Sequence, residues 1–441
     1  MKQKNSLILP ILTFFIVLFS CSTSSDSHQT ILEQNIPEFK SATSIEEVRS
    51  QIKKLPTDDI WWNVYGTDQS WNFKNAYRFM PTVAVYREGQ VNSLSINLNT
   101  EIEKFEVETK EGKRAFQEVI DSENSNTMGL VVVKNGEIVY EYYPNQEPYE
   151  KPIFWSVTKV VVSALVGILE DRGQIDTKKA ISHYLPELVN SDFKDVTVRN
   201  ILDMASGVNC QENYEDWGSC YYQYSATVGD GFWNENSPKS PYKFLATVKP
   251  GFSYEQGTNF EYSGVNTFLL SWLVEETMQM PFQDALSSEI WSKIGMESDA
   301  LLLAPRFGVA NTHGGLMARL RDVARFGMLY TPSAKTLTDE QIISDRIVNL
   351  IKNEGNLKLW EKAKEGGWLP PDMSHSAYQW DQVYTNHDFF KGGWCGQGLL
   401  VNPDKDLVVA YTGFCNDPQS SELNLLPVLR QVLNGVFPAN Q

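Results

Sequence analysis

Apolar and polar positions alternate most clearly in two parts of the chain, one near residue 130 and one near residue 400. In the stretch 128–143, two β-rich runs flank Asn135-Gly136, the dipeptide most typical of a two-residue hairpin turn. Near the C-terminus, apolar runs at 399–401 and 407–410 flank the turn residues of VNPDKD. Both patterns predict β-hairpins.

The pattern between the two hairpins is mainly helical. Residues 160–169 are apolar at nearly every position, and Gly173 follows their end. A helix that is apolar all round is expected to be buried, and glycine is common just past a helix end. Further helices are predicted from their periodicity at 196–207, 263–278, 316–330, 339–352 and 424–437.

Strands at both ends of the main region, with helices between them, predict an α+β fold. One sheet is then assembled from strands far apart in the sequence, with a helical insertion. The aromatic-rich residues 35–110 show no clear periodicity, and we interpret them as an extension wrapped on the main body. The predicted divisions are a leader at 1–21, a tether and N-terminal extension at 22–110, and a main domain at 111–441 with a helical subdomain at about 175–380.

The N-terminus has the pattern of an export signal. Lys2 and Lys4 precede an apolar run at 7–19, and Ser20-Cys21 opens a polar stretch. The residues LFSC resemble the lipobox of bacterial lipoproteins, in which the cysteine carries the lipid. We therefore expect a periplasmic or outer-membrane lipoprotein that is anchored to the membrane through Cys21. Cleavage near Ser20 without lipidation is the alternative.

Composition limits the partners of the protein. The chain has 441 residues, 42% of them hydrophobic, which is enough for a large core. Its formal net charge is −17, whereas a protein that binds the phosphate backbone of a nucleic acid needs a basic face. Nucleic acid is therefore not expected as a partner.

The cysteines predict disulfide bonds. Apart from Cys21, the chain has Cys210, Cys220, Cys395 and Cys415, and an even number in an exported protein allows three pairings. The first two bracket one short loop. The last two flank the C-terminal hairpin. The favoured pairing is therefore 210–220 and 395–415.

Several kinds of catalytic machinery are missing from the sequence. There is no Gly-x-Ser-x-Gly segment, so an α/β-hydrolase has no nucleophile here. The five histidines occur singly rather than in a zinc-binding cluster, and no glycine-rich phosphate-binding motif is present. We therefore expect neither a metal nor a cofactor.

One Ser-x-x-Lys pair has the surroundings that nucleophilic catalysis needs. A serine hydroxyl reacts poorly until a base takes its proton, and residues three apart on a helix share a face. Burial lowers the pKa of a lysine toward the range of a useful base. Only Ser156/Lys159 opens an apolar helix; the other three pairs lie in polar segments or turns. The four pairs are Ser50/Lys53, Ser156/Lys159, Ser191/Lys194 and Ser240/Lys243.

Three segments resemble the motifs of the penicillin-recognising serine hydrolases, particularly their class C β-lactamase-like branch. Ser156-Val157-Thr158-Lys159 resembles the first motif. Tyr262-Ser263-Gly264, which precedes a leucine-rich helix, resembles the second, and Lys391-Gly392-Gly393 before the C-terminal hairpin resembles the third. Their order and spacing agree with the family, and the resemblance covers about residues 70–415.

Within that superfamily, segments such as WSVTKVVVSALVGILEDRGQID are most similar to the 6-aminohexanoate-dimer hydrolases and related esterases. The resemblance implies a β-lactamase/transpeptidase-like antiparallel sheet flanked by helices, with an inserted helical subdomain. It also implies that Ser156 is the nucleophile, Lys159 its general base, and Tyr262 a second proton carrier. Lys391 would support the electrostatics of the site, and the backbone N–H groups of Ser156 and Trp394 would form the oxyanion hole.

The expected substrate contacts are Tyr214, Gly393 and Asn266. Gly264 stands where many relatives have Asn or Ser, so one side-chain hydrogen bond to substrate is missing. We therefore expect inefficient β-lactam hydrolysis, unless Asn266, two residues further on, takes that role.

The resulting hypothesis is an exported serine hydrolase that cleaves a small amide or ester through an acyl-serine intermediate. A D-amino-acid peptidase or β-lactamase carries the same motifs. The alternative from another class is a catalytically silent penicillin-binding-like module that recognises cell-wall peptides.

Overall fold

The computed structural model describes residues 36–40, 43–55, 60–122, 125–365, 369–418 and 425–438. The predicted leader, including Cys21, and nearly all of the tether lie outside these residues. Within them, no helix has both the length and the apolar composition of a membrane span.

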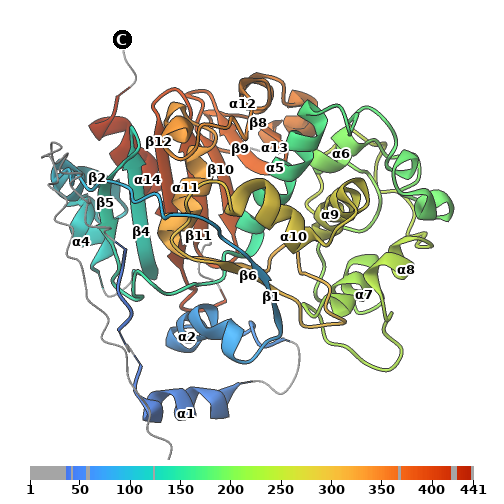
Figure 1. Cartoon of the computed structure of the whole chain (residues 1–441), viewed down its shortest axis with the longest axis horizontal. Helices are drawn as coiled ribbons and strands as arrows, with labels where there is room; N and C mark the ends of the chain where they lie inside the picture. Colours follow the sequence, from blue (N-terminus) through green and yellow to red (C-terminus); the bar gives the residue numbers. More distant parts are fainter. Residues whose placement is uncertain are drawn as a thin grey trace, which may run out of the picture. The chain divides into compact units, whose positions relative to one another are not determined.

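The main sheet has seven antiparallel strands (Figure 1), in the order β5-β4-β12-β11-β10-β9-β8. The pairing of β4 with β12 joins segments almost 280 residues apart, which confirms the predicted assembly from sequence-distant strands. The strands are β4 (Thr127–Lys134), β5 (Glu137–Tyr142), β8 (Met373–Ala377), β9 (Trp380–Tyr384), β10 (Phe389–Gly393), β11 (Gln397–Asn402) and β12 (Leu407–Gly413).

Successive residues of the central strands point to opposite faces of the sheet, as the two-residue period of a strand requires. Val131 and Val133 pack into the larger core with α5 (Thr158–Asp171), α9 (Gly264–Met278) and α11 (Leu320–Met328). Leu130 and Val132 pack into a second core with α14 (Leu425–Val436). Because both faces are covered, the predicted α+β fold with a sheet between helices is confirmed.

The remaining helices include a group that gathers to one side of the sheet, in the green and yellow part of Figure 1. That group is α6 (Val198–Leu202), α7 (Cys220–Thr227), α8 (Pro241–Leu245), α9 and α10 (Phe282–Leu286). The others are α1 (Ile45–Lys54), α2 (Thr67–Asn75), α3 (Glu101–Lys104), α4 (Phe116–Ile120), α12 (Asp345–Asn353) and α13 (Glu361–Glu365).

The strongest local patterns give the predicted elements. Asn135 and Gly136 have φ values of 53° and 81°, as the turn between β4 and β5 requires. The apolar helix α5 is buried from Thr158 to Leu169, and Gly173 follows with φ 70°. The segment 196–207, in contrast, is helical over only five residues, because the chain enters left-handed conformation at Met204 (φ 54°).

Short strands escape the sequence patterns. β1 (Thr82–Val85) pairs with β6 (Ala300–Leu303), and β6 pairs with β7 (Leu316–Met317), in a separate three-stranded sheet. A further pair is β2 (Glu106–Thr109) with β3 (Gly112–Ala115). β6, β7 and β8 lie in the region predicted as a helical subdomain. Strands of two to five residues are too short to show a clear alternation.

Candidate active site

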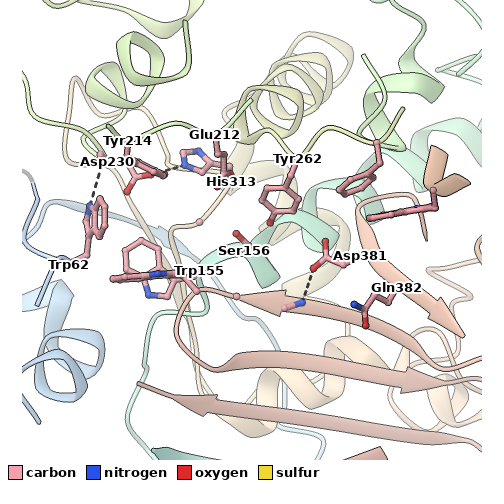
Figure 2. Close-up of a pocket in the computed structure, with 16 residues that line it drawn as sticks. Trp62, Trp155, Ser156, Glu212, Tyr214, Asp230, Tyr262, His313, Asp381 and Gln382 are labelled. Carbon is pink, nitrogen blue, oxygen red and sulfur yellow. Dashed lines mark hydrogen bonds and ion pairs between the residues drawn. The ribbon is translucent and has the colours of Figure 1, made fainter. Parts of the chain in front are cut away.

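Ser156 lies at the start of the buried helix α5 and lines a cavity of about 520 Å³. It is in the short helix η2 (Trp155–Val157), which leads directly into α5. The bulky Trp155 has φ 45°, an uncommon conformation that turns the chain sharply just before the serine. Figure 2 shows Ser156 between Trp62 and Asp230 on one side and Asp381 and Gln382 on the other.

Lys159 is fully buried beside Ser156. Its Nζ lies 2.9 Å from Ser156 Oγ and donates to the carbonyl oxygen of His313 at 2.8 Å. Burial lowers the pKa of Lys159 to about 8, opposed by the nearby Glu212 carboxylate and reinforced by the positive charge of Lys391. At pH 8 about half of this amine is therefore neutral and can accept the serine proton.

Tyr262 lies between the two buried lysines. It directly precedes Ser263, the N-cap residue of α9. Lys391 donates to its phenol oxygen at 2.8 Å, and the Nζ of Lys159 lies 4.8 Å from its ring centroid. The phenol oxygen of Tyr262 is therefore held in place by Lys391, and its ring lies close to the amine of Lys159.

Lys391 on β10 is also fully buried, and a carboxylate on the neighbouring strand β9 pairs with it. Its Nζ lies 2.6 and 2.8 Å from the two oxygens of Asp381. Asp381 also accepts from the backbone N–H of Gly392 at 3.1 Å. The Asp381 carboxylate offsets the buried charge of Lys391, and these three hydrogen bonds fix the geometry of the pair.

Glu212 reaches Lys159 from the loop that follows Cys210. Its carboxylate lies 3.5 Å from Lys159 Nζ. The loop is held against the start of α9, because Glu212 N donates to the Tyr262 carbonyl at 3.2 Å and Ser263 donates to the Cys210 carbonyl at 2.5 Å. The Cys210–Cys220 disulfide closes the same loop.

Trp394 follows the last residue of β10 and lines the cavity with Ser156. A Cβ added at Gly393 would lie 2.4 Å from the carbonyl oxygen of Phe154, so only glycine allows the strand end to approach the serine turn this closely. The structure therefore places the two predicted oxyanion-hole residues on adjoining segments. Cys395 forms a disulfide with Cys415, so the structure contains both predicted disulfides.

A buried polar cluster forms another wall of the cavity. His313 Nε2 lies 3.0 Å from Asp230 Oδ2, and its Nδ1 lies 2.9 Å from Tyr224 Oη. Tyr214 donates to Asp230 at 2.6 Å, and burial raises its pKa well above the usual value, so this phenol keeps its proton. The cluster fixes His313, whose carbonyl oxygen accepts a hydrogen bond from Lys159.

Most of the predicted site residues meet at this cavity, but Asn266 does not. Its side chain is fully buried within α9, where the amide donates to Met204 Sδ at 3.7 Å. Two residues along an α-helix correspond to a rotation of about 200°, so Asn266 faces away from the position of Gly264. Nor is there room for a side chain at Gly264, because an added Cβ would lie 2.8 Å from the His313 ring.

The sequence prediction missed more than half of the residues that line the cavity, including a carboxylate on a strand and four residues from loops. For Asp381 a signal existed: β9 and β10 pair with Gln382 opposite Phe390, and extending this register places Asp381 opposite Lys391. The other four come from loops without a distinctive local pattern. They are Trp62, Glu212, Asp230 and His313. Among the described residues, no group of three or more His, Cys, Asp or Glu side chains is arranged to hold a metal ion.

A serine with a buried lysine, a tyrosine and a second lysine, on an antiparallel sheet between helices, defines the class of β-lactamase-related hydrolases. The profile of the family described as Beta-lactamase matches residues 113–432, and the chain belongs to this family. It is 25% identical over 369 residues to the 6-aminohexanoate-dimer hydrolase of Paenarthrobacter ureafaciens, which covers 83% of this chain and 90% of that protein.

Solved structures show the same fold. A Bacillus anthracis protein classed as a 6-aminohexanoate-dimer hydrolase superposes with a TM-score of 0.71 at 23% identity, over 84% of this chain and 95% of that one. A class C β-lactamase superposes with a TM-score of 0.51 at 17% identity, over 74% and 95%.

Proposed function

We propose that the protein is an exported serine hydrolase that cleaves a small amide or ester through an acyl-serine intermediate. The observation that carries this proposal is the 2.9 Å contact between Ser156 Oγ and the fully buried Lys159 Nζ, whose pKa burial lowers to about 8. A hydroxyl and a partly neutral amine at this distance form an activated nucleophile.

In the acylation step, Ser156 Oγ attacks the carbonyl carbon while its proton passes to Lys159. The negative charge that develops on the carbonyl oxygen is stabilised by the backbone N–H groups of Ser156 and Trp394. Tyr262, held by Lys391, passes a proton to the departing nitrogen or oxygen, and the carbon–heteroatom bond breaks. Water then attacks the acyl-serine with the same groups acting in reverse, and releases the acid.

The substrate class follows from the size of the cavity and from the relatives. A cavity of about 520 Å³ suits a small molecule rather than a folded protein. The similarity to a 6-aminohexanoate-dimer hydrolase supports an amide of a short amino acid. Because His313 occupies the space beside Gly264, no side chain at that position can contact a β-lactam, and we expect β-lactams to be poor substrates.

Export is part of the proposal. The two disulfides support it, because disulfides persist in oxidising compartments. Lipidation of Cys21 is proposed from the sequence alone. Mass spectrometry of the mature N-terminus from a membrane fraction tests it: a diacylglyceryl cysteine at position 21 is expected, and an unmodified N-terminus in the soluble fraction would contradict it.

A fluorophosphonate probe tests the chemistry directly. The wild-type protein should be labelled at Ser156, and Ser156→Ala should not be. Ser50→Ala, from another Ser-x-x-Lys pair, is the matched control and should label like wild type. A wild-type protein that labels no faster than Ser156→Ala would instead support the silent penicillin-binding-like module. Turnover of p-nitrophenyl esters, short amides and nitrocefin, measured side by side, then ranks the substrate classes.

A further inference from the structure

Residues 60–65 bring a tryptophan to the active-site cavity from outside the matched family region. The family profile begins at residue 113, but Trp62 lines the cavity together with Ser156 and Trp394. Nothing in the catalytic proposal uses Trp62. The N-terminal extension therefore does more than cover the main domain, since it forms part of the wall that substrate meets.

The segment is anchored on both sides of the cavity. On one side, Trp62 Nε1 donates to the carbonyl oxygen of Asp230 at 3.3 Å. On the other side, Gly66 N donates to the carbonyl oxygen of Cys415 at 2.8 Å, and Gln69 accepts from Cys415 N at 2.6 Å. The disulfide from Cys415 continues to Cys395, the residue after Trp394. These contacts fix the position of Trp62 relative to the serine turn.

The half-buried Trp62 packs against three other aromatic side chains, and together they form an aromatic wall of the cavity. Its ring centroid lies 5.1 Å from that of Trp394, 5.3 Å from Tyr214 and 6.4 Å from Trp155, all in edge-to-face arrangements. Trp61, which is 2% exposed, stacks on Trp155 at 5.6 Å and supports the wall from behind. Rings packed in this way lose little conformational freedom when a ligand binds.

We infer that Trp62 is a specificity-determining residue, which favours substrates with an apolar chain or ring on the acyl side of the scissile bond. This inference rests on the proposed hydrolase function. An indole face offers a large apolar contact, and a longer acyl chain can cover more of it than a short one. The contact therefore changes the preference among substrates more than the reactivity of Ser156.

The test compares p-nitrophenyl acetate with p-nitrophenyl hexanoate in wild type, Trp62→Ala, Trp62→Leu and Trp62→Phe. In Trp62→Ala, the ratio of kcat/KM for hexanoate over acetate should fall about tenfold, mainly through a higher KM for hexanoate. Trp62→Phe keeps an aromatic face and should retain most of the ratio, with Trp62→Leu between the two. Trp217→Ala is the control, because Trp217 is 55% exposed and does not line the cavity.

The outcomes separate this inference from the proposed function. Fluorophosphonate labelling of wild type and of Trp217→Ala establishes that Ser156 is reactive, so that a changed ratio in Trp62→Ala reports the substrate preference. A hexanoate-to-acetate ratio that stays within twofold in Trp62→Ala overturns the inference. If Trp62→Ala does not fold, an unchanged ratio in Trp62→Leu overturns it equally. A wild-type protein without labelling or esterase activity contradicts the proposed function instead.

Discussion

Two fully buried lysines lie close to the ring of one tyrosine, and their charges are balanced differently. The Nζ atoms of Lys159 and Lys391 lie 4.8 and 4.6 Å from the centroid of the Tyr262 ring. Lys391 has a carboxylate with both oxygens within 2.8 Å. Lys159 lies 3.5 Å from a carboxylate oxygen of Glu212, and its closer partners are a hydroxyl and a carbonyl oxygen.

The difference bears on the roles proposed for the two lysines, Lys159 as the base and Lys391 as electrostatic support. Burial disfavours the charged form of any lysine, and a close, hydrogen-bonded carboxylate offsets that effect. At Lys159 the offset is incomplete, so the pKa falls to about 8. At Lys391 the salt bridge with Asp381 supplies a full counter-charge. The proposed mechanism gives the two lysines different roles, and substitutions at each lysine and its partners test them.

Removing the base should have the largest effect. Lys159→Ala leaves Ser156 without a group to accept its proton, and kcat/KM for the best ester substrate should fall by about 10³-fold. Steady-state kinetics at pH 8.5 measure the loss, and a thermal melt shows that the variant is folded.

Lys53→Ala provides the matched control for this experiment. Lys53 also lies three residues after a serine, but it is in the exposed helix α1. Its kcat/KM should equal that of wild type. If the kcat/KM of Lys159→Ala stays within tenfold of the wild-type value, another group activates Ser156.

Removing the carboxylate that pairs with Lys391 should have the next largest effect. Asp381→Asn leaves Lys391 buried without its anion, which should lower the free energy of unfolding by about 3 kcal/mol, since Asp381 itself is partly exposed. The kcat/KM should fall about 100-fold, because Lys391 no longer holds the phenol of Tyr262 in place. Urea denaturation and ester hydrolysis measure the two effects.

A surface ion pair gives the control for Asp381→Asn. Asp404 pairs with Lys352 and is 48% exposed, so Asp404→Asn should cost less than about 1 kcal/mol. If the two variants lose the same free energy of unfolding, the ion pair of Lys391 is not the buried, functional pair described above.

The reactive groups of the site and the residues that surround them differ in how far the sequence predicts them. Ser156 and Lys159 are three residues apart on an apolar helix, a pattern visible in one short window. Tyr262 and Lys391 follow in segments with their own local signals, a helix start and a strand before a hairpin. The main hairpins and long helices are predictable for the same reason, because their periodicity extends over many residues.

The carboxylates that balance the lysines are set by tertiary contacts instead. Glu212 lies in a disulfide-closed loop whose path no periodicity describes. Asp381 is predictable only after β9 and β10 are recognised as neighbours in register. Trp62 comes from an extension without regular patterning, and its contact with Trp394 spans more than 300 residues. Local sequence thus identifies the reactive groups better than the partners that tune them.

Removing the carboxylate near Lys159 should shift the pH dependence of the reaction. Below the Lys159 pKa of about 8 the amine is protonated and cannot act as a base, so the wild-type kcat/KM should rise with pH to a plateau above 8. The Glu212 anion raises this pKa, so Glu212→Gln should move the rising limb to lower pH. The plateau should change by less than about tenfold.

Profiles of kcat/KM between pH 5 and 10 measure this shift. Glu215→Gln, an exposed position in the same loop, should leave the profile unchanged. A rising limb that moves to higher pH in Glu212→Gln would reverse the sign of the proposed interaction.

The smallest expected effect comes from a methyl group at Gly264. Its Cβ would lie 2.8 Å from the His313 ring and 2.9 Å from Tyr221 Oη, so one of these must move. Gly264→Ala should therefore lower the free energy of unfolding by about 1–3 kcal/mol. Because the His313 carbonyl accepts from Lys159, a displaced His313 also loosens the base, and kcat should fall by about threefold.

Gly218→Ala, whose Cβ would meet only the end of a flexible Asp216 side chain at 3.3 Å, is the control. If both variants are as stable and active as wild type, His313 does not fix the position of Lys159.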